Sequence, residues 1–160
     1  MLLKIIGGII ISVGTWLLGK NVENKYREKI KTIDSFILLL YKFKSAIAFS
    51  GTNMYSFFEK NADAFTKNFL EYLVIKKNPY ALNEYLYSND VEKKCISIFV
   101  ESLTVAENSS DADLISESLE ESINKLKQYK NEFLEEHRGK MKTAPAIGLI
   151  IGVFVAVLII

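Results

Sequence analysis

Side chains suited to catalysis or metal binding are few in this chain. Its 160 residues include one cysteine, Cys95, and one histidine, His137. A structural zinc site takes about four nitrogen or sulfur ligands, so these two residues cannot supply one. The phosphate-binding loop, the dinucleotide-binding glycine motif and the nucleophile elbow of hydrolases are also missing from the sequence. We therefore expect no catalytic residue, no cofactor and no metal, and we expect that the protein is not an enzyme.

Charge is balanced and argues against a nucleic-acid partner. Lysine and arginine number 20, aspartate and glutamate 19, and the formal net charge is +1. Proteins that bind nucleic acid through bulk charge are visibly basic. The eight tyrosines and ten phenylalanines fall at core spacings, with no basic stripe between them for base stacking. We expect neither a nucleic acid nor a small-molecule substrate.

The charges are absent from both ends of the chain. The residues between Lys4 and Lys20 are uncharged, and so are all residues after Lys142. A helix needs roughly 17–25 apolar residues to cross a hydrocarbon core of about 30 Å. We predict transmembrane helices at residues 1–19 and 143–160, with a soluble helical bundle at residues 20–142. A cleaved signal peptide is the alternative for the first segment, but no small-residue cleavage site follows it.

Basic residues flank the inner side of both predicted spans. Lys20, Lys25 and Arg27 follow the first span, and Arg138 and Lys140 precede the second. Basic residues near the ends of spans stay in the cytoplasm. Both flanks therefore place the middle of the chain in the cytoplasm and both termini across the membrane.

Small residues recur at helical spacing in both spans, where they would let helix backbones pack closely. Whether these two stripes face each other or other proteins stays open from the sequence. The predicted packing residues are Gly8, Ser12, Ala144, Gly148, Gly152 and Ala156.

The middle of the chain shows the three-to-four-residue apolar period of helices. Gly51, Asn78-Pro79 and Ser109–Asp111 supply helix-ending and helix-capping residues. Pro145 predicts either a bend in the last helix or the first turn of a separate one. The fold class is all-α, with six helices expected in the soluble part, at residues 22–49, 54–60, 62–77, 80–87, 89–106 and 111–142.

Laid out in this way, the chain resembles the stage III sporulation protein AB family of endospore-forming bacteria over almost its full length. The resemblance lies in the order of three features: an N-terminal span that begins Leu-Leu-Lys-Ile-Ile-Gly, the basic segment Lys25-Tyr26-Arg27-Glu28, and Lys140-Met141-Lys142 before a glycine-bearing last span. It implies a six-helix cytoplasmic bundle similar to those of type II secretion and type IV pilus platform proteins. It also implies a secretion-like channel complex between mother cell and forespore, in the mother-cell-side (outer forespore) membrane, with a secretion-type ATPase, other subunits and oligomers as partners.

On this reading the chain is a non-enzymatic platform subunit that docks the ATPase and other subunits. We expect the contacts on a basic segment of the first helix and on an acidic turn, although either group could equally be a solvated surface. The candidate partner-binding residues are Lys25, Arg27, Lys29, Lys31, Glu107, Asp111 and Asp113. The alternative is a two-span signalling relay or scaffold unrelated to secretion, which has almost no residues outside the membrane to bind a ligand.

Overall fold

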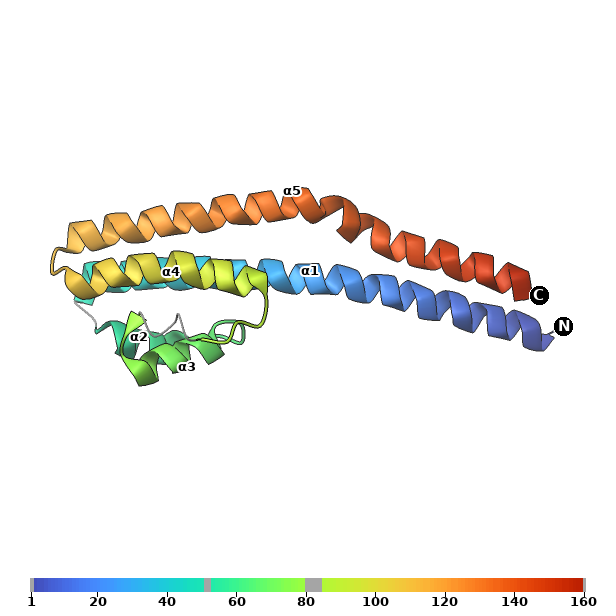
Figure 1. Cartoon of the computed structure of the whole chain (residues 1–160), viewed down its shortest axis with the longest axis horizontal. Helices are drawn as coiled ribbons and strands as arrows, with labels where there is room; N and C mark the ends of the chain where they lie inside the picture. The colour runs from blue at the N-terminus through green and yellow to red at the C-terminus, as the bar shows by residue number, and fades with distance from the viewer. Residues whose placement is uncertain (1, 51–52, 80–84, 160) are drawn as a thin grey trace. The chain divides into compact units, whose positions relative to one another are not determined.

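The structure is a computed structural model that describes residues 2–50, 53–79 and 85–159, and in these ranges the protein is entirely helical, without a strand. Figure 1 labels its helices. The helices are α1 (Leu2–Ser50), α2 (Met54–Asn61), α3 (Lys67–Lys76), α4 (Asp90–Asn108) and α5 (Ala112–Ile159).

The all-α prediction is confirmed, but the described ranges hold five helices rather than a six-helix bundle flanked by two separate spans. The apolar ends are not helices of their own, because each is continuous with a long helix, α1 or α5. Helix α1 continues through Gly19, which stands at the predicted boundary, and no glycine or proline occurs from Lys20 to Ser50. The expected short helix at residues 80–87 lies largely outside the described residues.

The chain divides into two compact units. The first combines Met1–Glu28 with Glu132–Ile160, and the second is Lys29–Asn131. The first, here the end unit, contains both apolar segments, and Figure 1 shows the two chain ends beside each other in it. The second, here the middle unit, contains α2, α3 and α4 with the adjoining parts of α1 and α5.

A cluster of phenylalanines forms the core of the middle unit. Phe99 of α4 contacts Phe36 of α1, Phe58 of α2 and Phe69 of α3, with ring centroids 5.7, 5.4 and 5.3 Å apart. All four rings are fully buried. One ring on α4 therefore joins three other helices, and the apolar side chains of α5 that add to this core are Ile115, Leu119, Ile123 and Leu126.

Side-chain caps set the helix starts. Asn53 caps α2 and Asn89 caps α4, each by accepting backbone N–H hydrogen bonds. The third helix begins later than the predicted Ala62, because the carboxylate of Asp63 accepts hydrogen bonds from the backbone N–H groups of Phe65 and Thr66. Phe65 consequently lies in this turn and is 37% exposed, although the apolar spacing of the expected helix at residues 62–77 would turn it toward the core.

Helix α5 runs through Pro145 without ending. Figure 1 shows α5 bending where its colour passes from orange to red. A proline inside a helix removes one backbone hydrogen bond and kinks the axis. The predicted bend is therefore present, and the alternative that Pro145 begins a separate helix is wrong.

Candidate functional site

The two small-residue stripes of the end unit face each other. A Cβ atom built on Gly19 would lie 2.8 Å from the Cα of Pro145, and one built on Gly152 would lie 2.6 Å from the Cα of Ser12. A Cβ on Gly148 would overlap the carbonyl oxygen of Thr15. Real Cβ atoms do not approach backbone this closely, so these glycines allow α1 and α5 to pack backbone against backbone.

Of the predicted packing residues, Gly8, Gly152 and Ala156 are buried, while Ser12, Ala144 and Gly148 are half-buried. Gly7 and Gly14 lie off this interface, because a Cβ on either would have no neighbour within 4 Å. Neither glycine is among the packing residues predicted from the sequence.

Large apolar side chains cover the outer faces of the same segments. Ile10, Leu18, Ile150 and Phe154 are each about two-thirds exposed, at 65–67%. Both α1 and α5 are long and apolar enough to cross a membrane. A surface of this kind is unfavourable in water and suits contact with lipid chains.

A buried carboxylate marks the first charged turn after the apolar segment of α1. Glu23 is 7% exposed, and its two oxygens accept hydrogen bonds from Lys20 Nζ at 2.9 Å and Arg27 Nε at 2.7 Å. These two cations hold the pKa of Glu23 below its usual range. Glu23 is not among the residues expected from the sequence, although its spacing of three and four residues from Lys20 and Arg27 is the helical spacing for ion pairs.

An aromatic group joins α1 and α5 at the same level of the end unit. The ring of His137 stacks on Phe133, with centroids 4.3 Å apart, and lies 4.8 Å from the ring of Tyr26. His137 Nδ1 lies 3.0 Å from the carbonyl oxygen of Phe133. The lone histidine is thus a packing residue in this arrangement.

The basic candidates on α1 differ in their surroundings. Lys25 and Lys31 are exposed, and Lys29 is half-buried. Arg27 forms the ion pair with Glu23. Three of the four candidates, Lys25, Arg27 and Lys31, are therefore exposed, but Arg27 already has a partner within its own helix.

The acidic candidates have structural partners in the middle unit. Asp111 caps α5, because its Oδ1 accepts hydrogen bonds from the backbone N–H groups of Asp113 and Leu114. Glu107 accepts a 2.8 Å hydrogen bond from the hydroxyl of Tyr55. Burial, together with this hydrogen bond, raises the pKa of Tyr55 to about 12. All three acids are exposed.

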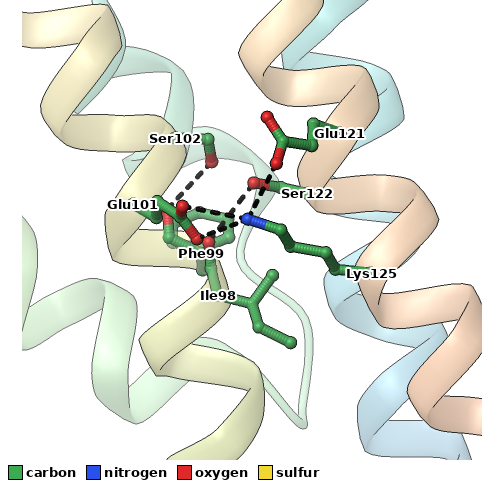
Figure 2. Close-up of polar contacts among 7 residues, drawn as sticks. All are labelled: Ile98, Phe99, Glu101, Ser102, Glu121, Ser122 and Lys125. Carbon is green, nitrogen blue, oxygen red and sulfur yellow. Dashed lines mark hydrogen bonds and ion pairs between the residues drawn. The ribbon is translucent and has the colours of Figure 1, made fainter.

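Polar contacts join α4 and α5, as Figure 2 shows. Lys125 lies between Glu101 and Glu121, with its Nζ 2.9 and 3.0 Å from their carboxylate oxygens. Ser122 is buried, and its hydroxyl donates to the carbonyl oxygen of Ile98 on α4. These contacts fix the position of α5 along α4.

Cys95 lies in that core. Its side chain is fully buried, and burial raises the pKa of the thiol to about 12. A thiol in this environment behaves as a small apolar side chain.

Comparison with known proteins identifies the family of the chain. No curated protein matches the chain, and no solved structure does. The family model of stage III sporulation protein AB matches residues 4–160. The two apolar ends and the helical middle thus lie within one family match, and the chain belongs to the stage III sporulation protein AB family of sporulation-associated proteins.

Proposed function

We propose that this protein is a non-enzymatic membrane platform subunit of a secretion-like complex formed during sporulation. Its paired ends would anchor it in the membrane that faces the mother cell, and its helical middle would dock a secretion-type ATPase and other subunits in the cytoplasm. The family membership supplies the sporulation context. The secretion-like complex and the ATPase are what the resemblance to this family implies, and the arrangement of the chain supports only the anchored, helical part of the proposal.

The observation that supports this role most is that one chain combines an apolar helix pair with a helical unit that has its own core. Gly19, Gly148 and Gly152 bring the two apolar ends together, so both ends of the chain would enter the same membrane side by side. The phenylalanine core holds the middle unit independently of them. An anchored module of this kind suits the presentation of a docking surface.

Partner docking requires charged side chains that are accessible. Lys25 and Lys31 are exposed, and so are Glu107 and Asp111. The two acids, however, already serve structural contacts, a hydrogen bond with Tyr55 and a helix cap. We therefore assign the ATPase contact to the exposed lysines of α1 rather than to the acidic turn.

The test is purification of the tagged full-length protein from sporulating cells, with quantitative mass spectrometry of what accompanies it. A K25E/K31E variant is compared with K93E/K94E, which makes the same charge change on exposed residues of α4. We expect a secretion-type ATPase with the wild type and the control, and its loss with K25E/K31E. Recovery of a sensor kinase in its place, or equal ATPase recovery with K25E/K31E, would contradict the assignment.

A further inference from the structure

The end unit contains a groove of about 480 Å³ between α1 and α5. Glu23 and Arg27 line it from α1, and the other lining residues come from α5. Those residues are Leu134, Glu135, Arg138, Met141, Lys142 and Pro145.

Three cations, two carboxylates and apolar groups share this groove, so its lining carries a net charge of +1. The carboxylates are Glu23, which pairs with Arg27, and Glu135, which is exposed. Arg27, Arg138 and Lys142 are exposed lining residues that carry positive charge. Oε1 of Glu23 lies 2.7 Å from Nε and 2.6 Å from Nη2 of Arg27, and these two contacts fix the orientation of the guanidinium. A guanidinium has five N–H donors, so Arg27 retains donors for a second oxyanion.

The groove lies beside the start of both apolar segments. Arg27 follows the last residue of the predicted first span by two helical turns, and Pro145 and Lys142 stand at the beginning of the second. If the apolar ends cross the membrane, these residues lie at the level of the lipid headgroups. Basic pockets between transmembrane helices on the cytoplasmic side are suited to anionic headgroups.

We propose that this groove binds the headgroup of an anionic phospholipid. Arg27, Arg138 and Lys142 contact the phosphate oxygens, and the apolar side chains of Leu134 and Met141 lie against the glycerol and the first acyl carbons. The apolar part of the lining favours a lipid over a free phosphate ion, and the cations disfavour the added amine of a zwitterionic headgroup. The inference rests on the membrane anchoring in the proposed function, but not on the ATPase.

The test uses the full chain reconstituted in nanodiscs that contain equal amounts of phosphatidylglycerol and phosphatidylcholine. Lipids retained by the released protein are identified by native mass spectrometry. The variant R138Q/K142Q removes two groove charges, and the matched control K25Q/K140Q removes two exposed charges near the same boundary that do not line the groove. Far-UV circular dichroism checks that both variants remain helical.

We expect the wild type and K25Q/K140Q to retain phosphatidylglycerol in preference to phosphatidylcholine. In R138Q/K142Q, the ratio of retained phosphatidylglycerol to phosphatidylcholine should fall by on the order of fivefold for each charge removed. Equal losses in both variants, or no preference in the wild type, would overturn the groove as a binding site. Loss of the lipid on adding inorganic phosphate, but not chloride of equal ionic strength, would reassign the groove to a soluble anion.

The same samples separate this inference from the proposed function. A wild-type chain that fails to incorporate into nanodiscs would overturn the membrane anchoring itself. A chain that incorporates without lipid preference overturns only the lipid site, and leaves the ATPase contact to its own test.

Discussion

The backbone of Gly152 lies directly against that of Ser12, so that a Cβ on the glycine would come within 2.6 Å of the Ser12 Cα. This contact joins the last apolar segment of the chain to the first. Because lipid chains are as apolar as leucine, close packing of small residues is what pairs helices within a membrane. The two ends of the chain therefore pair with each other as helices through their own contacts.

Enlarging Gly152 should separate the two helices. Gly152→Leu forces a side chain into the Ser12 backbone, and overpacking of this kind costs about 1–3 kcal/mol. Gly14→Leu makes the same change on α1 where a Cβ meets nothing within 4 Å, so its stability should stay near that of the wild type. Unfolding in mixed SDS micelles measures both, and equal stabilities of the two variants would show that the helices do not pack through Gly152.

Truncating the central ring of the middle unit should be severe. Phe99→Ala removes the contacts with Phe36, Phe58 and Phe69 together, and such substitutions cost about 3–5 kcal/mol. Ile75→Ala on α3 is the control, because Ile75 is 78% exposed and its loss should change stability by roughly 0.5 kcal/mol or less. Chemical denaturation of the full chain compares them, and a mild effect of Phe99→Ala would place the core elsewhere.

One ion pair between α1 and α5 should make stability depend on pH. Lys44 Nζ lies 2.7 Å from Glu120 Oε2, and this contact lowers the pKa of Glu120. Because the folded pKa lies below the unfolded value, the pair stabilises the fold above the unfolded pKa of a glutamate. That stabilisation is lost as the pH falls through the folded pKa.

Glu120→Gln should therefore lower stability at neutral pH by about 0–1 kcal/mol, the usual range for an exposed pair, and have no effect at acidic pH. Glu117→Gln removes an exposed carboxylate three residues earlier on the same helix and serves as the control. Denaturation curves at both pH values decide the matter. A deficit for Glu120→Gln that persists in acid would assign its effect to packing.

The cap of α5 can be separated from any charge-dependent contact at Asp111. Asp111→Ala removes the acceptor of the Asp113 and Leu114 N–H groups and should cost about 0.5–2 kcal/mol. Asn caps helices as well as Asp does, so Asp111→Asn should keep the stability while it removes the charge. If Asp111→Asn lost partners in the purification from sporulating cells while remaining stable, Asp111 would be a contact residue as well as a cap.

The sequence sufficed for those parts of the fold that depend on local patterns. The apolar period predicted helices over most of α1 and α4, and the expected helix start at residue 89 and the capping segment Ser109–Asp111 agree with the caps at Asn89 and Asp111. The apolar stripe expected on the first long helix did not include Phe36, which is fully buried in the core. The late start of α3 was missed because Asp63 and Thr66 satisfy each other in a turn that competes with helix, and apolar spacing carries no sign of such a competition.

The candidate site was only partly predictable, because it depends on contacts between residues far apart in the sequence. Spacing identified both small-residue stripes, but their pairing is a contact between residues more than a hundred positions apart, such as Thr15 and Gly148. Glu23 was overlooked because its burial depends on its partners Lys20 and Arg27 and on the neighbouring helix. Long-range packing of this kind is not encoded in any local pattern.

Labelling of the single cysteine measures whether the core of the middle unit is closed. Cys95 is buried, and its pKa is raised to about 12, so little reactive thiolate forms near neutral pH. A maleimide should modify the folded wild type only after denaturation. Rapid labelling of the native protein would contradict the burial of Cys95 in the core of the middle unit.

The central claim is that both ends of the chain pair as helices in the membrane while the middle unit lies in the cytoplasm. Cysteine accessibility of the full chain in a bacterial membrane tests this claim most directly. Glu117→Cys places a thiol on an exposed position of the middle unit, and a second variant carries a cysteine appended to the C-terminus. We predict that a membrane-impermeant maleimide labels the C-terminal cysteine in intact cells and Glu117→Cys only after permeabilisation. Labelling of Glu117→Cys in intact cells, or recovery of the chain in the soluble fraction, would contradict the claim.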